Sequence, residues 1–68
     1  MNKDMLRSFM VARGETQEIL ADALGISLSR FNAKLNETGG AEFKKSEMEC
    51  IKRRYNLDAQ TMDTIFFA

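Results

Sequence analysis

Two short helical segments separated by a two-residue turn that begins with a glycine most strongly restrict how this chain can fold. Thr16 offers a hydroxyl that can start a helix, and apolar residues then recur on one helical face until Gly25 ends the segment. Ser27 offers a second helix-starting hydroxyl only two residues after that glycine. We therefore predict two helices, at residues 17–24 and about 27–36, that are joined by a very short turn.

The rest of the chain shows the same helical spacing. The sequence contains no proline, and its paired Gly39 and Gly40 predict a loop at residues 37–40, because adjacent glycines cost too much backbone entropy inside a helix. We predict one all-α domain over residues 1–68, a compact arrangement of five helices. The three further helices are expected at residues 3–12, at about 45–55 and from Asp58 to near residue 66.

The start of the fourth helix has two interpretations. Ser46 followed by Glu49 has the sequence pattern of a capping box. Alternatively, the helix begins one or two residues earlier, with Glu47 in its first turn.

Composition excludes several functions. The 68 residues include one cysteine, Cys50, and no histidine, which rules out an intrachain disulfide, a Cys/His zinc site and histidine-based catalysis. We expect a protein that is not an enzyme and that uses no metal or cofactor. No segment has the roughly 20 apolar residues of a membrane span or the apolar stretch of a signal peptide, so we expect no membrane partner and a cytoplasmic location.

The segment TQEILADALGIS at residues 16–27 resembles the start of the helix-turn-helix in phage repressors, Cro proteins and the wider XRE-like family. The shared features are the early Gln17, the small Ala21 after a leucine, the turn glycine between apolar residues and the capping serine. FNAKLN at residues 31–36 and IFF at residues 65–67 further resemble small phage proteins of this family. The resemblance covers essentially the whole chain and implies a lambda-repressor-like DNA-binding domain in a bacterial host.

For the phosphate backbone of DNA, the resemblance implies contacts from three polar residues. Gln17 would lie at a helix N-terminus, where the amide and the helix dipole both favour an anion. Ser27 would donate to a second phosphate, and Asn36 would reach the backbone on the far side. Simple helix capping is the alternative role for Gln17 and Ser27.

For the bases, the resemblance implies four contacts from the second helix of the motif. Ser29 and Asn32 would face base edges, with Asn32 able to pair with adenine. Leu28 and Ala33 would contact thymine methyl groups. For Leu28 a core position is the alternative, because it lies on the same side of the helical wheel as Phe31.

Other charged and apolar residues have more ordinary interpretations. Arg30 and Lys34 are expected to point away from the apolar stripe, towards either phosphates or solvent. The basic run at residues 52–54 is expected to be a solvated helix face. Cys50 is expected to be a half-buried structural thiol. Of the two aromatic residues near the end of the chain, Phe66 is assigned to the core, and position 67 is left open between the core and a partner surface.

The leading hypothesis is a phage or prophage transcriptional regulator of Cro type that binds double-stranded operator DNA. Ten basic and ten acidic residues give a net charge of zero, and the segment 37–42 has two acids and no base, so a monomer should bind DNA weakly. We therefore expect a homodimer on a palindromic operator. A different hypothesis is an antirepressor-like modulator that docks on a phage repressor protein, and an antitoxin is a third.

Overall fold

Side-chain oxygen atoms cap the start of four of the five helices in the computed structural model, which describes residues 1–67. Asn2, Thr16, Ser27 and Asp58 each accept a hydrogen bond from the backbone N–H three residues later. The five α-helices of residues 1–67, with no strand among them, confirm the all-α prediction. They are α1 (Lys3–Ala12), α2 (Gln17–Leu24), α3 (Leu28–Leu35), α4 (Lys45–Tyr55) and α5 (Ala59–Phe66).

The start of α4 follows the second of the two sequence interpretations. The Glu47 carboxylate accepts a hydrogen bond of 2.7 Å from the backbone N–H of Lys44, and no capping box forms between Ser46 and Glu49. The segment predicted as a plain loop contains a short 3-10 turn, Thr38–Gly40. This turn is possible because its two glycines adopt positive φ angles of 60° and 80° without steric cost.

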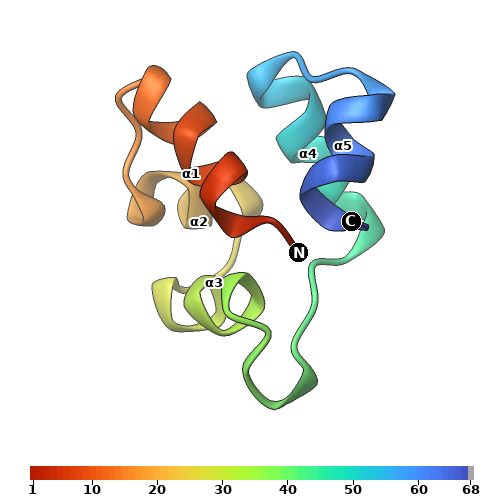
Figure 1. Ribbon diagram of the computed structural model, residues 1–68. Helices are drawn as coiled ribbons and strands as arrows, with labels where there is room; N and C mark the ends of the chain where they lie inside the picture. Colours follow the sequence, from red (N-terminus) through yellow and green to blue (C-terminus); the bar gives the residue numbers. More distant parts are fainter. Residues whose placement is uncertain (68) are drawn as a thin grey trace.

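All five helices contribute to one apolar core. In Figure 1, α4 and α5 lie beside each other on one side of the molecule, while α1, α2 and α3 occupy the other. The backbone N–H of Asn2 donates to the carbonyl of Ile65 at 2.6 Å, which ties the start of the chain to α5. The side chains with essentially no exposure are Leu6, Leu20, Phe31, Leu35, Ile51 and Ile65.

Phe43, in the connection before α4, joins the two sides of the core. Its ring meets Phe31 edge-on at 5.6 Å and Phe66 edge-on at 5.8 Å between ring centroids. Phe66 therefore packs against the core as predicted. None of the helices in the described chain has the length and apolar character that a bilayer-spanning segment requires.

Candidate nucleic-acid interface

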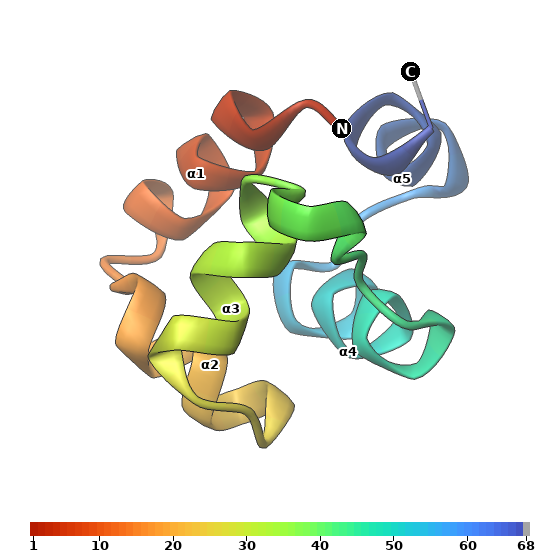
Figure 2. The same ribbon diagram turned by 90° about the horizontal axis from the view of Figure 1, so that it is seen from below.

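Helices α2 and α3 form a tightly connected unit. The Thr16 hydroxyl accepts from the Ile19 N–H at 3.2 Å, and the Ser27 hydroxyl accepts from the Arg30 N–H at 3.1 Å. Between the helices, Gly25 has φ 73°, a left-handed conformation that a residue with a Cβ rarely adopts. The two helices pack against each other, and Figure 2 shows α3 lying across α2. The conformation of Gly25, the hydrogen bond of 3.1 Å from the Ile26 N–H to the Ala21 carbonyl and the packing of the two helices thus set the direction of α3 relative to α2.

Of the four residues expected to face bases, two are exposed on α3 and two are half-buried. Ser29 is exposed, Asn32 and Ala33 are half-buried, and Leu28 is 41% exposed. Leu28 therefore does not belong to the core, and its alternative role as a core residue is wrong. Leu28 is the first residue of α3, and the buried face of this helix is formed by later residues, namely Phe31, Lys34 and Leu35.

The three residues expected at phosphates differ in their local bonding. Ser27 is exposed and caps α3, as its alternative role predicts, whereas Thr16, and not the half-buried Gln17, caps α2. Asn36 is exposed at the end of α3, where its Nδ2 donates to the Asn32 carbonyl at 3.0 Å. Its Oδ1 accepts from the Nζ of Lys3 at 2.9 Å, so α1 restrains this side chain.

Lys34 does not point away from the apolar stripe, and that prediction is wrong. Its Nζ lies 2.7 Å and 2.8 Å from the two carboxylate oxygens of Glu47 on α4. The two side chains are only 5% and 7% exposed. A lysine at the edge of the buried face can enter the core when a carboxylate there compensates its charge. Lys34 is therefore withdrawn from any contact with phosphates.

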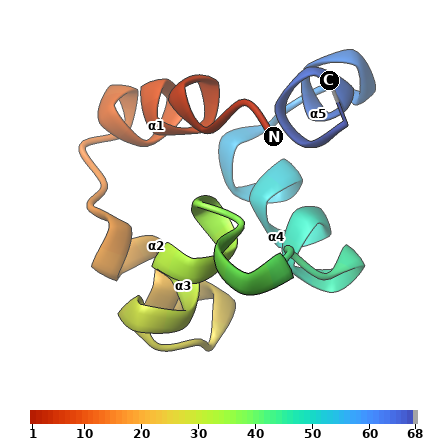
Figure 3. The same ribbon diagram turned by 60° about the horizontal axis from the view of Figure 1, so that its bottom comes forward.

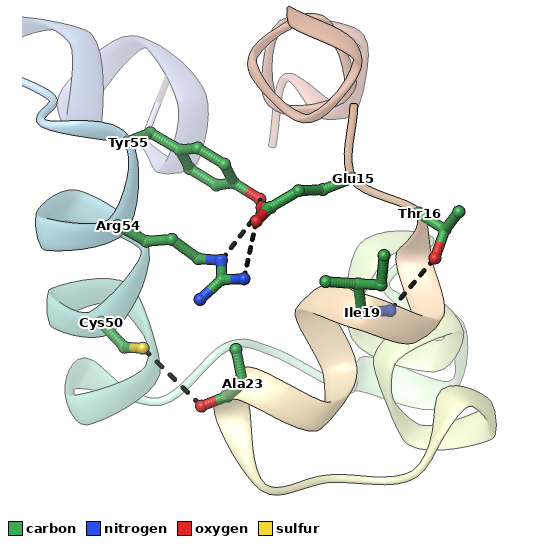
Figure 4. A network of polar contacts seen from close by, with 7 residues as sticks. All are labelled: Glu15, Thr16, Ile19, Ala23, Cys50, Arg54 and Tyr55. Atoms are coloured by element: carbon green, nitrogen blue, oxygen red, sulfur yellow. Dashed lines mark hydrogen bonds and ion pairs between the residues drawn. The ribbon is translucent and has the colours of Figure 1, made fainter. Parts of the chain in front are cut away.

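A second polar cluster joins the other end of α4 to the segment before α2, as Figure 4 shows. The Arg54 guanidinium makes two hydrogen bonds to the Glu15 carboxylate, at 3.0 Å and 2.6 Å. The Tyr55 hydroxyl donates to the same carboxylate at 2.8 Å. Arg54 is thus not part of a simple solvated face, in contrast to the expectation for residues 52–54. The exposed Arg53 fits that expectation.

Cys50 lies near this cluster and is half-buried, as expected for a structural thiol. Its Sγ is 3.9 Å from the Ala23 carbonyl oxygen of α2, which is a weak contact (Figure 4).

Both polar clusters shift the pKa values of their members. For Glu47, burial acts to raise the pKa, but the hydrogen bonds from Lys34 and from the Lys44 backbone outweigh it and lower the pKa. For Glu15, the hydrogen bond from Arg54 is the main cause of a lowered pKa. Burial, together with the hydrogen bond to Glu15, raises the pKa of Tyr55 above its ordinary range. The carboxylates are therefore ionised and fully paired at neutral pH.

The charges that remain available on α3 are few. With Lys34 buried, Arg30 is the one exposed cation within Leu28–Leu35, and that helix contains no acidic residue. Among residues 1–67, no cluster of three or more acidic or cysteine side chains could hold a metal ion. The accessible side of α3 thus offers the exposed Leu28, Ser29 and Arg30 and the half-buried Asn32 and Ala33.

No protein-family model, curated protein or solved structure matches this chain. A proposal for its function therefore depends on its own residues and their arrangement.

Proposed function

We propose that this protein is a sequence-specific DNA-binding regulator of Cro type, with α3 inserted into the major groove of an operator. The observation that carries the proposal is the surface position of α3 on a rigid two-helix unit, with an acid-free exposed side. The major groove, about 12 Å wide, accepts a helix, and short polar and apolar side chains let the helix approach the bases closely. A cytoplasmic phage or prophage regulator is the biological setting that this proposal implies.

In this arrangement, the base contacts come from the first two turns of α3. The Asn32 amide can make paired hydrogen bonds with adenine, while Ser29 accepts from or donates to a neighbouring base. Leu28 and Ala33 contact thymine methyl groups. Gln17 and Ser27 would donate to phosphates, as would Asn36, whose side chain is already oriented by Lys3.

The charges of the chain predict that one copy binds DNA weakly and that a homodimer binds it more tightly. The net charge is zero, and three of the ten cations, Arg7, Lys34 and Arg54, already pair within the chain. Few phosphates are then neutralised, so the affinity should fall only gently with added salt. A homodimer on half-sites about one helical turn apart would double the contacts.

The test is a fluorescence-anisotropy titration at low salt with duplexes from the region beside the protein's own gene, against random duplexes. We expect a clear preference for one duplex, and we expect Asn32→Ala to weaken that binding on the order of tenfold. Gln60→Ala, at an exposed position on α5, is the matched control and should bind like the wild type. Equal affinity for all duplexes would rule out sequence-specific binding.

A second candidate is an antirepressor-like modulator that binds a phage repressor protein. The exposed Glu42 favours it, because residues 37–42 contain two acids and no base, although the Glu37 carboxylate already accepts a hydrogen bond of 2.6 Å from the N-terminal ammonium of Met1. Such a surface suits a basic DNA-binding domain better than it suits DNA. Co-purification with a neighbouring repressor, without operator binding by the protein alone, would favour this candidate over the first.

A further inference from the structure

An exposed phenylalanine lies beside an apolar hollow at the end of α5. Phe67 is 71% exposed, although its neighbour Phe66 packs on the core. Between α4 and α5 lies a hollow of about 350 Å³ whose apolar lining includes Met48, Met62 and Phe67 itself. A smaller hollow of about 150 Å³ also has Met48 and Phe67 in its lining. Phe67 thus borders both hollows with most of its side chain exposed, and a two-fold axis would place this side chain of one copy against the same surface of the other.

The charged residues around the larger hollow balance one another. Lys45 and Lys52 lie on its α4 side with Glu49 between them in sequence, and Asp63 lies on its α5 side. Two positive and two negative side chains thus surround the apolar lining. If a second copy presents the same surface in the opposite direction, charges of opposite sign face each other across the contact. A strongly basic or strongly acidic partner would instead place some of its charges against residues of the same sign.

We infer that a second copy of this chain binds at this surface, with each Phe67 entering the other copy's hollow between α4 and α5. The zero net charge of the chain favours this occupant, because two copies do not repel each other at long range. The inference deepens the proposed homodimer by naming its surface.

The dimer should be weak, because the available surface is small. An interface of standard size takes about 800 Å² from each partner, about a fifth of the 4247 Å² surface of the molecule. Phe67 and the hollow supply only the centre of such an interface. The lining of the larger hollow contains no residue of α3, and Figures 1 and 3 both show α5 well away from α2 and α3.

The experiment measures the mass of the full chain by sedimentation equilibrium, without DNA, from low micromolar to millimolar concentration. We expect the wild type to approach the dimer mass with increasing concentration. Phe67→Ser should raise the dimer dissociation constant at least about tenfold, since it removes the central apolar contact. Val11→Ser is the matched control, because Val11 is 76% exposed on α1 and lies outside the hollow.

A charge exchange sharpens the test. Asp63→Lys alone should weaken the dimer, and combining it with Lys52→Glu should restore much of the loss if these residues face each other across the two-fold axis. A monomer at every concentration overturns the inference, as does a dimer that responds equally to Phe67→Ser and Val11→Ser. Because this experiment contains no DNA, neither result tests operator binding, which the anisotropy titration tests separately.

Discussion

The two ends of α4 are held to the rest of the chain by ion pairs that differ greatly in exposure. Near its start, Glu47 and Lys34 of α3 are 7% and 5% exposed. Near its end, Arg54 is 32% exposed and its partner Glu15 is 16% exposed. Each pair has two hydrogen bonds, so the number of bonds does not distinguish them. The exposure of the side chains does distinguish them. Breaking each pair should therefore lower the free energy of unfolding by a different amount.

The comparison shows how burial changes what an ion pair does. In the buried pair, water cannot replace a missing partner, so each charge depends on the other. In the more exposed pair, water can solvate Arg54 when Glu15 is lost, and long side chains gain freedom. The first pair thus fixes α3 against α4 strictly, while the second holds the segment before α2 more loosely.

The largest effect is expected from breaking the buried pair on one side. Glu47→Ala leaves the Lys34 ammonium buried without a counter-charge and should cost about 3–5 kcal/mol of unfolding free energy. A domain of 68 residues has on the order of 3–10 kcal/mol in total. We therefore expect a largely or partly unfolded variant, seen as a lower urea midpoint by circular dichroism.

A double variant separates the buried charge from other effects. Lys34→Met with Glu47→Leu removes both charges and retains apolar volume, so its cost should be only about 1 kcal/mol, mainly from the lost bond to the Lys44 N–H. If the double variant is as unstable as the single one, an uncompensated charge is not the cause.

Sequence patterns predicted the helices well because their ends depend on neighbouring residues. Thr16, Ser27 and Asp58 each cap a helix through a bond to an N–H three residues away, and Gly25 ends α2 with its own backbone conformation. Such features lie within one or two turns of the chain and are visible in the sequence. The exposed position of Ser29 on α3 follows from the same local periodicity.

The ion pairs could not be predicted in this way because their partners are distant in sequence. Lys34 lies three positions after the buried Phe31, at the edge of the buried face. At such a position a lysine side chain can point either into the core or into solvent. Glu47, which decides its direction, lies 13 residues later on another helix. Arg54 and Glu15 are 39 residues apart. Only the packing of α4 against the α2–α3 unit brings these partners together.

The next largest effect is expected at the more exposed pair. Glu15→Ala removes the acceptor for both Arg54 and the Tyr55 hydroxyl and should cost about 1–2 kcal/mol, since water can reach the freed guanidinium. Urea unfolding of this variant should show a midpoint between those of the wild type and Glu47→Ala. A loss as large as that of Glu47→Ala would mean that exposure does not govern these pairs.

Low pH should reduce the stabilisation from the ion pairs at both ends of α4. Glu47 and Glu15 have pKa values below their ordinary 4.5 in the folded chain, so the unfolded chain takes up protons first as the pH falls. Their contribution to stability is therefore complete above about pH 5, falls below about pH 4.5 and is lost once the pH passes the folded pKa values. Protonation of each carboxylate should lower the free energy of unfolding less than replacement of the same residue by alanine does, because a protonated carboxyl still accepts hydrogen bonds.

Urea unfolding at a series of pH values measures this loss, with Glu47→Gln and Glu15→Gln as variants that cannot titrate at these positions. Each variant should show a shallower fall of unfolding free energy between about pH 5 and pH 3 than the wild type. An unchanged slope in either variant would show that its carboxylate has the same pKa in the folded and unfolded chain.

The smallest effect is expected from salt, and it tests the difference between the two ends most directly. At 1 M NaCl the screening length is about 3 Å, but ions act only where solvent reaches the charges. The cost of Glu15→Ala should therefore shrink by a few tenths of a kcal/mol relative to low salt. The loss of unfolding free energy on breaking the buried pair should not change with salt, so we expect the difference between wild type and Glu47→Ala to stay constant.

Comparing each variant with the wild type in the same salt cancels the general effect of salt on folding. Equal salt dependence at both ends would show that solvent reaches the pair of Lys34 and Glu47, and that the two ends of α4 differ less than their exposures indicate.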